Sequence, residues 1–232
     1  MTFNIRNHGN IVVFTGAGIS KESGIPTYRG PGGVWTKYDY ESVACERAFQ
    51  RDPERVWEFN NQRRETVGAC KPNRAHEILA EMQRELDNLT IVTQNIDGLH
   101  QAAGAKDVIE LHGSLWRVRD ADGEVQVIRD PVVLEDPKDA QGRWLRPDIV
   151  WFGDPLRQRD IALAAEAVQG CDLFIAIGTS GSVTPAAHLP AMAAQLGKMT
   201  MEINVEDTML SPIFHLTPRG SAATILEEIW SP

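Results

Sequence analysis

Three short apolar runs, each followed at once by small or polar residues, constrain the fold of this chain most. The runs are residues 11–14, 90–93 and 173–177; the first leads into a turn at Gly16 and the third into one at Gly178. Continuous apolar runs of this length are typical of strands buried on both faces of a parallel sheet. We therefore expect three buried parallel strands, each ending in a turn.

Stretches with helical spacing lie between these runs. Apolar side chains recur every three or four positions in residues 53–66, 74–86 and 160–168. Residues 198–205 have the pattern of a further strand, and residues 224–230 that of a closing helix. Strands that alternate with helices predict the α/β class, with a doubly wound, Rossmann-like parallel sheet that binds ligands at the carboxyl ends of its strands.

Two stretches interrupt this alternation. Residues 28–72 have a helical pattern broken by three glycines and a proline at 29–33, and residues 114–147 are charged and turn-rich, with alternation at 124–128. We interpret them as a small lobe, made of a helical part and a β-ribbon, inserted into the Rossmann-like domain. That domain would then comprise residues 1–27, 73–113 and 148–232.

Charge and composition exclude several function classes. The 232 residues include 23 Lys and Arg against 32 Asp and Glu, a net charge of −9, which argues against nucleic-acid or anionic-membrane partners. No apolar run approaches the ~20 residues of a membrane span, and the first residues lack a signal-peptide pattern. We therefore expect a cytoplasmic protein. Cys45, Cys70 and Cys171 are dispersed, without a C-x-x-C pair, and predict unpaired thiols.

Polar and small residues follow each predicted strand. Gly16-Ala17-Gly18-Ile19-Ser20 has the context of a pyrophosphate-binding turn, although a plain strand-to-helix turn fits as well, since Lys21 stands where a third glycine would fall. Gln94-Asn95-Ile96-Asp97 offers groups for a ribose or carboxamide; alternatively, Asp97-Gly98 is only a turn.

His112 is the histidine best placed for proton transfer. It follows the apolar run at 108–111, and an imidazole of ordinary pKa, about 6.5, is largely neutral at pH 7 and can accept a proton. Gly178-Thr179-Ser180 offers two hydroxyls at a third strand end, and Asn204 and Glu206 follow the strand at 200–203. Plain turns remain the alternative for these two segments.

In this order and at this spacing, the motifs resemble the sirtuins, NAD-dependent protein lysine deacylases, over about residues 10–230. Arg51-Asp52-Pro53-Glu54 and the stretch 59–64 are most similar to the bacterial branch. The motifs are Gly16-Ala17-Gly18-Ile19-Ser20, Gly24-Ile25-Pro26-Thr27-Tyr28-Arg29, Thr93-Gln94-Asn95-Ile96-Asp97-Gly98-Leu99-His100, Leu111-His112-Gly113, Val150-Trp151-Phe152-Gly153-Asp154 and Ile177-Gly178-Thr179-Ser180.

The resemblance implies a set of site residues. It implies that NAD is bound by Gly16, Ala17, Gly18, Ser20, Arg29, Gln94, Asn95, Asp97, Gly178, Thr179, Ser180, Asn204 and Glu206. His112 would be the general base, with Asn95 and Asp97 beside it, and the products would be free lysine, nicotinamide and an O-acyl-ADP-ribose. The acyl-lysine peptide would bind as an added strand at Val150, Trp151, Phe152, Gly153 and Val183, with Arg63 in the acyl tunnel.

The sequence departs from most sirtuins in two respects. Residues 114–147 contain none of the cysteines that hold a structural zinc in the family, so we expect no metal and a lobe held by packing of Leu115, Trp116, Val118, Val125, Val127, Ile128, Val132, Val133, Leu134 and Trp144. In place of the Tyr-x-x-Arg pair that contacts acidic acyl groups, the chain has Asn60-x-x-Arg63. We expect uncharged acyl groups to be removed faster than succinyl, unless Tyr28, Tyr38 or Tyr40 supplies the missing hydroxyl.

Two other function classes remain open at this point. One is an NAD-consuming hydrolase or protein ADP-ribosyltransferase that uses the same site. The other is an NAD-binding module without catalysis, against which the presence of Asn95, Asp97 and His112 argues, because a sensor needs no base beside the ribose.

Overall fold

The main element of the fold is a five-stranded parallel sheet. The computed structural model describes residues 3–28, 30 and 32–230. The strand order is β3-β2-β1-β7-β8. In register, Thr15 at the end of β1 lies opposite Thr93 of β2 and Ile177 of β7, so the turns after these strands meet at one edge of the sheet. The bounds are β1 Ile11–Thr15, β2 Leu89–Thr93, β3 Val108–Glu110, β7 Leu173–Ile177 and β8 Met199–Ile203.

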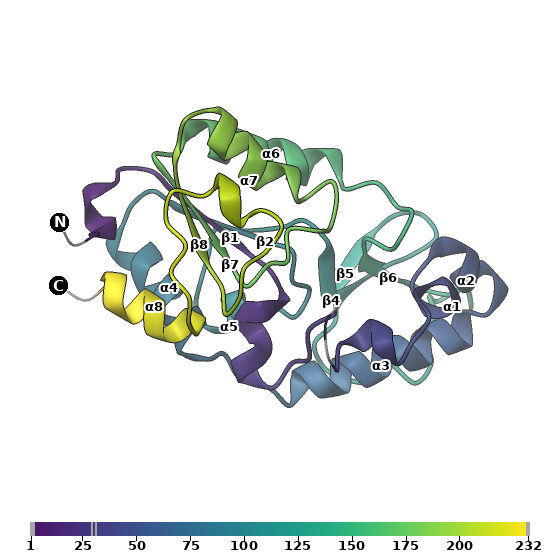
Figure 1. Ribbon diagram of the computed structural model, residues 1–232. Helices are drawn as coiled ribbons and strands as arrows, with labels where there is room; N and C mark the ends of the chain where they lie inside the picture. The colour runs from purple at the N-terminus through teal and green to yellow at the C-terminus, as the bar shows by residue number, and fades with distance from the viewer. Residues whose placement is uncertain (1–2, 29, 31, 231–232) are drawn as a thin grey trace.

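Helices cover both faces of this sheet (Figure 1). On one face α4 (Arg74–Glu85) and α8 (Ala222–Trp230) enclose an apolar core with β1, β2, β7 and β8. On the other, α6 (Gln158–Gly170) and α7 (His188–Gln195) pack over Phe14 and Phe174. The short helix α5 (Leu99–Ala102) follows β2. Among the described residues, no helix is both long and apolar enough to cross a membrane.

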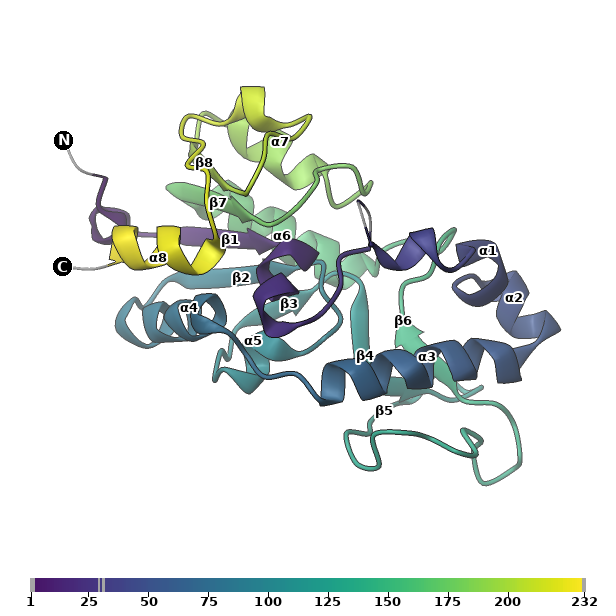
Figure 2. The ribbon, with the colours of Figure 1, turned by 60° about the horizontal axis from the view of Figure 1, so that its bottom comes forward.

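A second, antiparallel sheet with strand order β5-β4-β6 lies beside the first (Figure 2). Its strands are β4 (Gly113–Arg119), β5 (Val125–Val127) and β6 (Arg146–Ile149). Helix α3 (Pro53–Gly68) packs along it, preceded by α1 (Tyr40–Val43) and α2 (Glu46–Arg51). Short 3-10 helices occur at Ile5–Asn7 (η1), Ala17–Ser23 (η2), Val34–Thr36 (η3) and Ser211–Ile213 (η4).

The expected α/β class and doubly wound parallel sheet are confirmed. The predicted ribbon at 124–128 is the edge strand β5 of a larger sheet, whose β4 begins at Gly113 and whose β6 ends at Ile149. Strands β4 and β6 were not predicted from the sequence, because Pro147 and the charged residues 117, 119 and 146 interrupt the apolar pattern that indicates a strand. The last strand of the large sheet is also shorter than residues 198–205.

The expected packing of the small lobe is wrong for three of its valines. Val125, Val127 and Val132 are 49%, 68% and 36% exposed. The first two lie on β5, an edge strand whose partner is β4, and Val132 lies in the segment after β5. Leu115, Trp116, Val118 and Leu134 are buried as expected, with Ile128 and Trp144 packed against them. Val133 is half-buried.

A buried guanidinium, which was not predicted from the sequence, binds several main-chain carbonyl groups of the small lobe. Arg64 of α3 is 1% exposed. It donates hydrogen bonds to the carbonyl oxygens of Leu115 (2.6 Å), Ile128 (2.7 Å), Pro131 (3.1 Å) and Val132 (2.5 Å). Its guanidinium carbon also lies 5.1 Å from the centroid of the Trp116 ring. Arg64 therefore joins α3, β4 and the segment 128–132.

Candidate active site

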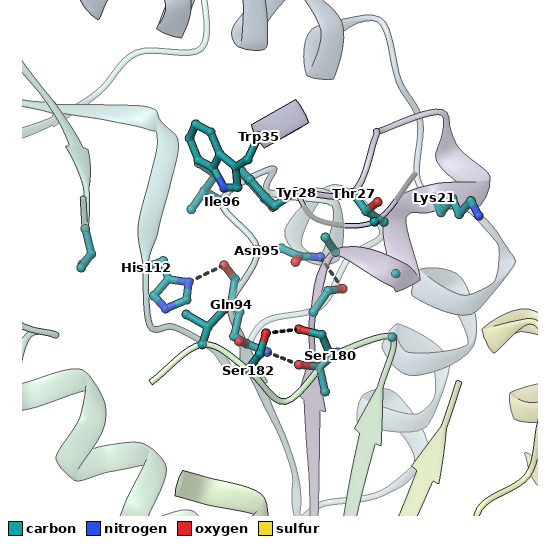
Figure 3. Close-up of a pocket in the computed structure, with 18 of the residues that line it drawn as sticks. Lys21, Thr27, Tyr28, Trp35, Gln94, Asn95, Ile96, His112, Ser180 and Ser182 are labelled. Carbon is teal, nitrogen blue, oxygen red and sulfur yellow. Dashed lines mark hydrogen bonds between the residues drawn. The ribbon is translucent and has the colours of Figure 1, made fainter. Parts of the chain in front are cut away.

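A cavity of about 730 Å³ opens at the carboxyl ends of the parallel strands (Figure 3). Its walls come from the turns after β1, β2, β7 and β8, from the segment after β6, and from the helical part of the small lobe. The predicted site residues that line it are Gly16, Ala17, Gly18, Arg63, Gln94, Asn95, His112, Val150, Trp151, Phe152, Gly153, Gly178, Thr179, Ser180, Val183, Asn204 and Glu206.

Three predicted site residues stand apart. Ser20 and Asp97 do not line this cavity; they border a smaller one of about 20 Å³, which shares Ala17, Tyr28 and Asn95 with it. The third, Arg29, lies outside the described residues.

Glycines bring the turns after β1 and β7 into direct contact. The Gly18 N–H donates to the Gly178 carbonyl oxygen at 2.8 Å, and the Gly16 N–H donates to the Ile177 oxygen at 3.0 Å. A Cβ added to Gly18 would lie 2.6 Å from the Gly178 Cα, so no side chain fits there. Gly178 itself has φ +59°, which favours glycine. The result is a strand-end wall of bare main chain, the kind of surface that a pyrophosphate can approach closely.

Buried hydrogen bonds hold the turn after β2. The Asn95 amide donates to the Gly16 carbonyl oxygen and to the Ser20 hydroxyl, both at 3.1 Å. The Ser20 hydroxyl donates to Asp97 Oδ2 at 2.7 Å, and Asp97 Oδ1 accepts from the Leu99 N–H at 2.9 Å. Burial raises the pKa of Asp97. Asp97-Gly98 is indeed a turn, with Gly98 at φ +74°, but Asn95 is buried at the cavity wall.

The hydrogen bond of His112 determines which of its ring nitrogens carries the proton. His112 Nδ1 lies 2.9 Å from the carbonyl oxygen of Gln94, which can only accept, so Nδ1 is the protonated nitrogen (Figure 3). Nε2 then has the free lone pair. Burial lowers the pKa of His112, which keeps the imidazole neutral at pH 7. This histidine can therefore take a proton from a group in the cavity.

Two further histidines lie behind the site and do not line the cavity. The rings of His76 and His100 are buried with their centroids 4.9 Å apart. Burial lowers the pKa of His76 to about 4, and its Nδ1 lies 3.0 Å from Asn73 Oδ1 at the start of α4. Their burial behind the cavity fits a structural role for both histidines.

Aromatic side chains form another wall, which joins Phe152, a predicted substrate contact, to Trp35 and Phe59, which were not predicted. Trp35 packs against Phe152, with ring centroids 5.4 Å apart, and against Phe59 at 6.0 Å. Trp35 and Tyr28 lie together across the cavity from Ser180 (Figure 3). The resemblance to the sirtuins implied Phe152 as a substrate contact, whereas no pattern in the sequence indicated that Trp35 and Phe59 face the cavity.

Arg63 meets a tyrosine from that wall. The Arg63 guanidinium donates a hydrogen bond to the Tyr28 hydroxyl and lies 5.0 Å from the Tyr28 ring centroid. Asn60 is buried, and its amide donates to the Val56 carbonyl oxygen of its own helix at 2.8 Å. Among the described residues, Arg63 has no carboxylate in ion-pair contact.

No metal site accompanies these features within residues 3–28, 30 and 32–230. Those residues contain no group of three or more His, Cys, Asp or Glu side chains arranged to hold a metal ion. Cys45 and Cys70 are half-buried and Cys171 is buried, and all three are free thiols.

Comparison with known proteins agrees with the motifs. The model of the Sir2 family matches residues 16–185. The NAD-dependent protein deacylase 1 of Caldanaerobacter subterraneus is 48% identical over 88% of this chain and 86% of its own length. A Sir2 homologue crystallised with NAD superimposes with a TM-score of 0.90 at 41% identity, over 97% of this chain and 90% of that one.

A third similar protein was solved with a peptide and an acetylated ADP ribose bound together. It is a Sir2 enzyme in complex with a deacetylated p53 peptide and 3'-O-acetyl ADP ribose, with a TM-score of 0.87 and 31% identity over 97% of this chain and 93% of that chain. The resemblance to the sirtuins is thus confirmed, and the chain belongs to the Sir2 family.

Proposed function

We propose that this protein removes acyl groups from protein lysine side chains in an NAD-dependent reaction that releases nicotinamide and O-acyl-ADP-ribose. The observation that carries the proposal is the neutral His112 in a cavity whose other walls are the strand-end turns at Gly16, Asn95 and Gly178. The deacylase relative and the neighbours with NAD, peptide and acetyl ADP ribose support it.

The donor set fits NAD. The bare main chain at Gly16, Ala17, Gly18 and Gly178 suits the pyrophosphate, and Ser180, Asn204 and Glu206 offer polar groups for the adenosine half. Asn95 and Asp97, held through Ser20, suit the nicotinamide ribose and carboxamide, with Gln94 beside them. The remaining predicted contacts are Thr179, whose hydroxyl accepts from the Gln94 amide at 2.9 Å, and Arg29. When bound, NAD would supply two groups: the ribose carbon that the acyl oxygen attacks, and the nicotinamide that leaves that carbon.

In this proposal His112 is the general base. Because Nδ1 carries the proton and donates its hydrogen bond to the Gln94 carbonyl oxygen, Nε2 is free to accept the proton of a ribose hydroxyl. Asn95 and Asp97 act earlier, because they fix the orientation of the nicotinamide ribose. In the same proposal, the aromatic wall at Trp35 and Phe152 excludes bulk water from the site.

An acyl-lysine peptide is the proposed partner, and it would bind as an added strand. Val150 and Trp151 follow directly from β6, and Phe152, 37% exposed, stands at the cavity wall with Gly153. Val183 lines the same cavity. The proposed arrangement is a peptide sandwiched between these two segments, with its acyl chain pointing toward Arg63. A cytoplasmic location and the division into a Rossmann-like domain and a small lobe belong to the same proposal.

Product analysis tests this function against its alternatives. The experiment incubates the protein with NAD and an acetyl-lysine peptide and identifies the products by mass. Free lysine peptide together with O-acetyl-ADP-ribose is the expected result. Free ADP-ribose without deacetylation would indicate an NAD hydrolase, and a mass gain on the peptide would indicate an ADP-ribosyltransferase. Binding of NAD with no product would leave only a binding module.

The acyl range is tested at Tyr28. Because the Tyr28 hydroxyl contacts Arg63, it is the alternative supplier of the group that Asn60 lacks, and Tyr28→Phe removes only that hydroxyl. A hydrogen bond to a charged group contributes about 1.5–3 kcal/mol. We predict that Tyr28→Phe lowers kcat/KM for a succinyl peptide roughly tenfold and leaves acetyl turnover within twofold. Equal losses on both peptides would contradict this role of Tyr28; Asn60→Tyr serves as the comparison variant.

Zinc content is a further prediction. We expect the purified protein to hold less than about 0.1 zinc per chain, and a chelator to leave its melting temperature and activity unchanged, because residues 114–147 contain no thiolate or imidazole ligand. Elemental analysis and a thermal melt with and without chelator measure this. A sirtuin that contains the zinc-binding cysteines is the positive control and should lose stability. About one zinc per chain would refute the prediction.

A further inference from the structure

An arginine that does not itself line the cavity holds the turn that follows β6. Arg146 donates to Asp154 Oδ2 at 2.5 Å and to Glu46 Oε2 of α2 at 2.9 Å. Its guanidinium carbon lies 3.9 Å from the centroid of the Trp151 ring. The side chain is only 14% exposed. One guanidinium therefore connects β6, α2 and the turn at 151–154.

Asp154, which is paired with Arg146, is also hydrogen-bonded to the main chain of the turn. Its Oδ2 also accepts from the Trp151 N–H at 3.2 Å, and its own N–H donates to the Trp151 carbonyl oxygen at 3.0 Å. These bonds close a tight turn in which Gly153 has φ +90°. On the inner side, the Val150 N–H donates to the His112 carbonyl oxygen at 2.9 Å and the Phe152 N–H donates to the Ala44 oxygen at 3.1 Å.

The groups that remain available are those a bound strand would need. Within the described part of the chain, no hydrogen bond engages the carbonyl oxygens of Val150 and Phe152 or the N–H of Gly153. The Phe152 ring is placed at the cavity, 4.3 Å from the Tyr40 ring centroid. The turn thus presents unpaired main-chain groups and one aromatic ring from a fixed conformation.

We propose that Arg146, acting through Asp154, is a positioning residue for the peptide substrate, an inference that rests on the proposed deacylase function. By fixing the segment Val150–Gly153 before the peptide arrives, the arginine reduces the ordering that binding must otherwise impose. Its planar guanidinium serves two carboxylates and an aromatic face at once, which the single ammonium of lysine cannot do. Arg146 touches neither NAD nor the acyl group in this proposal, so its effect falls on peptide affinity.

The test compares Arg146→Gln and Arg146→Lys with a matched control, Arg143→Gln. Arg143 bridges two carboxylates of the same lobe, Asp122 and Asp139, both at 2.6 Å, but neither the arginine nor its partners line the cavity. Both Arg146 variants should raise the KM for an acetyl peptide about tenfold while kcat and the Kd for NAD stay within twofold. Arg143→Gln should leave all three values unchanged.

Asp154→Asn is a second variant that weakens the same connection, and it keeps the size and shape of the side chain. It should give the same rise in KM, and the double variant Arg146→Gln/Asp154→Asn should be no worse than either single variant, since both remove one connection. The inference is overturned by an unchanged KM in Asp154→Asn, by equal effects of Arg143→Gln and Arg146→Gln, or by parallel losses of NAD binding. Absence of deacylation by the parent protein would instead refute the proposed function itself.

Discussion

Replacing His112 by alanine is expected to lower kcat for deacylation by about 10²–10⁴-fold, the usual cost of losing a general base. The Kd for NAD should stay within about threefold, because the glycine turns and Asn95, which we propose as NAD contacts, are held by bonds that do not involve the imidazole. Single-turnover deacylation and NAD titration measure the two effects. His188→Ala, at an exposed histidine that begins α7, is the matched control and should be silent.

The pH dependence of the parent provides an independent check on His112. A general base must be neutral, and burial lowers the pKa of His112 below its ordinary value of 6.5. Activity should therefore be constant at neutral and mildly alkaline pH and fall only as the pH drops through the lowered pKa. An acid limb above pH 7, or a His112→Ala variant that keeps more than half of the parent's kcat, would exclude this residue as the base.

The strand-end part of the site could be predicted because it follows from local patterns. Apolar runs before Gly16, Gln94 and Gly178 identify strands, and the carboxyl ends of parallel strands meet at one edge of a sheet. The contact between Gly18 and Gly178 follows from that geometry once β1 and β7 are neighbours. The location of His112 after β3 was predicted in the same way.

The small lobe could be predicted far less well, because its contacts join residues distant in sequence. Tyr28 and Arg63 are 35 positions apart, and no periodicity indicates that they touch. Val125 and Val127 read as core residues from their alternation, but an edge strand with one partner leaves them exposed. A run of two arginines at 63 and 64 would ordinarily indicate a solvated helix face; instead one lines the cavity and the other is buried.

The second large expected effect is a loss of stability when the buried Arg64 is replaced. Arg64→Met should lower the free energy of unfolding by at least about 3 kcal/mol, as expected when a buried charged donor is removed and its partners remain. Four carbonyl oxygens, on Leu115, Ile128, Pro131 and Val132, would lose their shared donor in a lobe that we expect to have no zinc. For a chain of this size, about 3 kcal/mol corresponds to a fall in Tm of roughly 6–12 °C.

Arg63→Met on the same helix is the matched control for this stability effect. It removes an equal volume and charge, but Arg63 faces the cavity. Within the described part of the chain its hydrogen-bonding contact is the Tyr28 hydroxyl, so we expect a change below about 1 kcal/mol. Arg64→Lys should resemble Arg64→Met, since a lysine cannot reach four carbonyls at once. Hydrogen exchange should show the loss of protection concentrated in β4 and residues 128–134, with the five-stranded sheet unaffected. Equal Tm values for the two methionine variants would show that packing of Trp116 and Leu134, rather than Arg64, holds the lobe together.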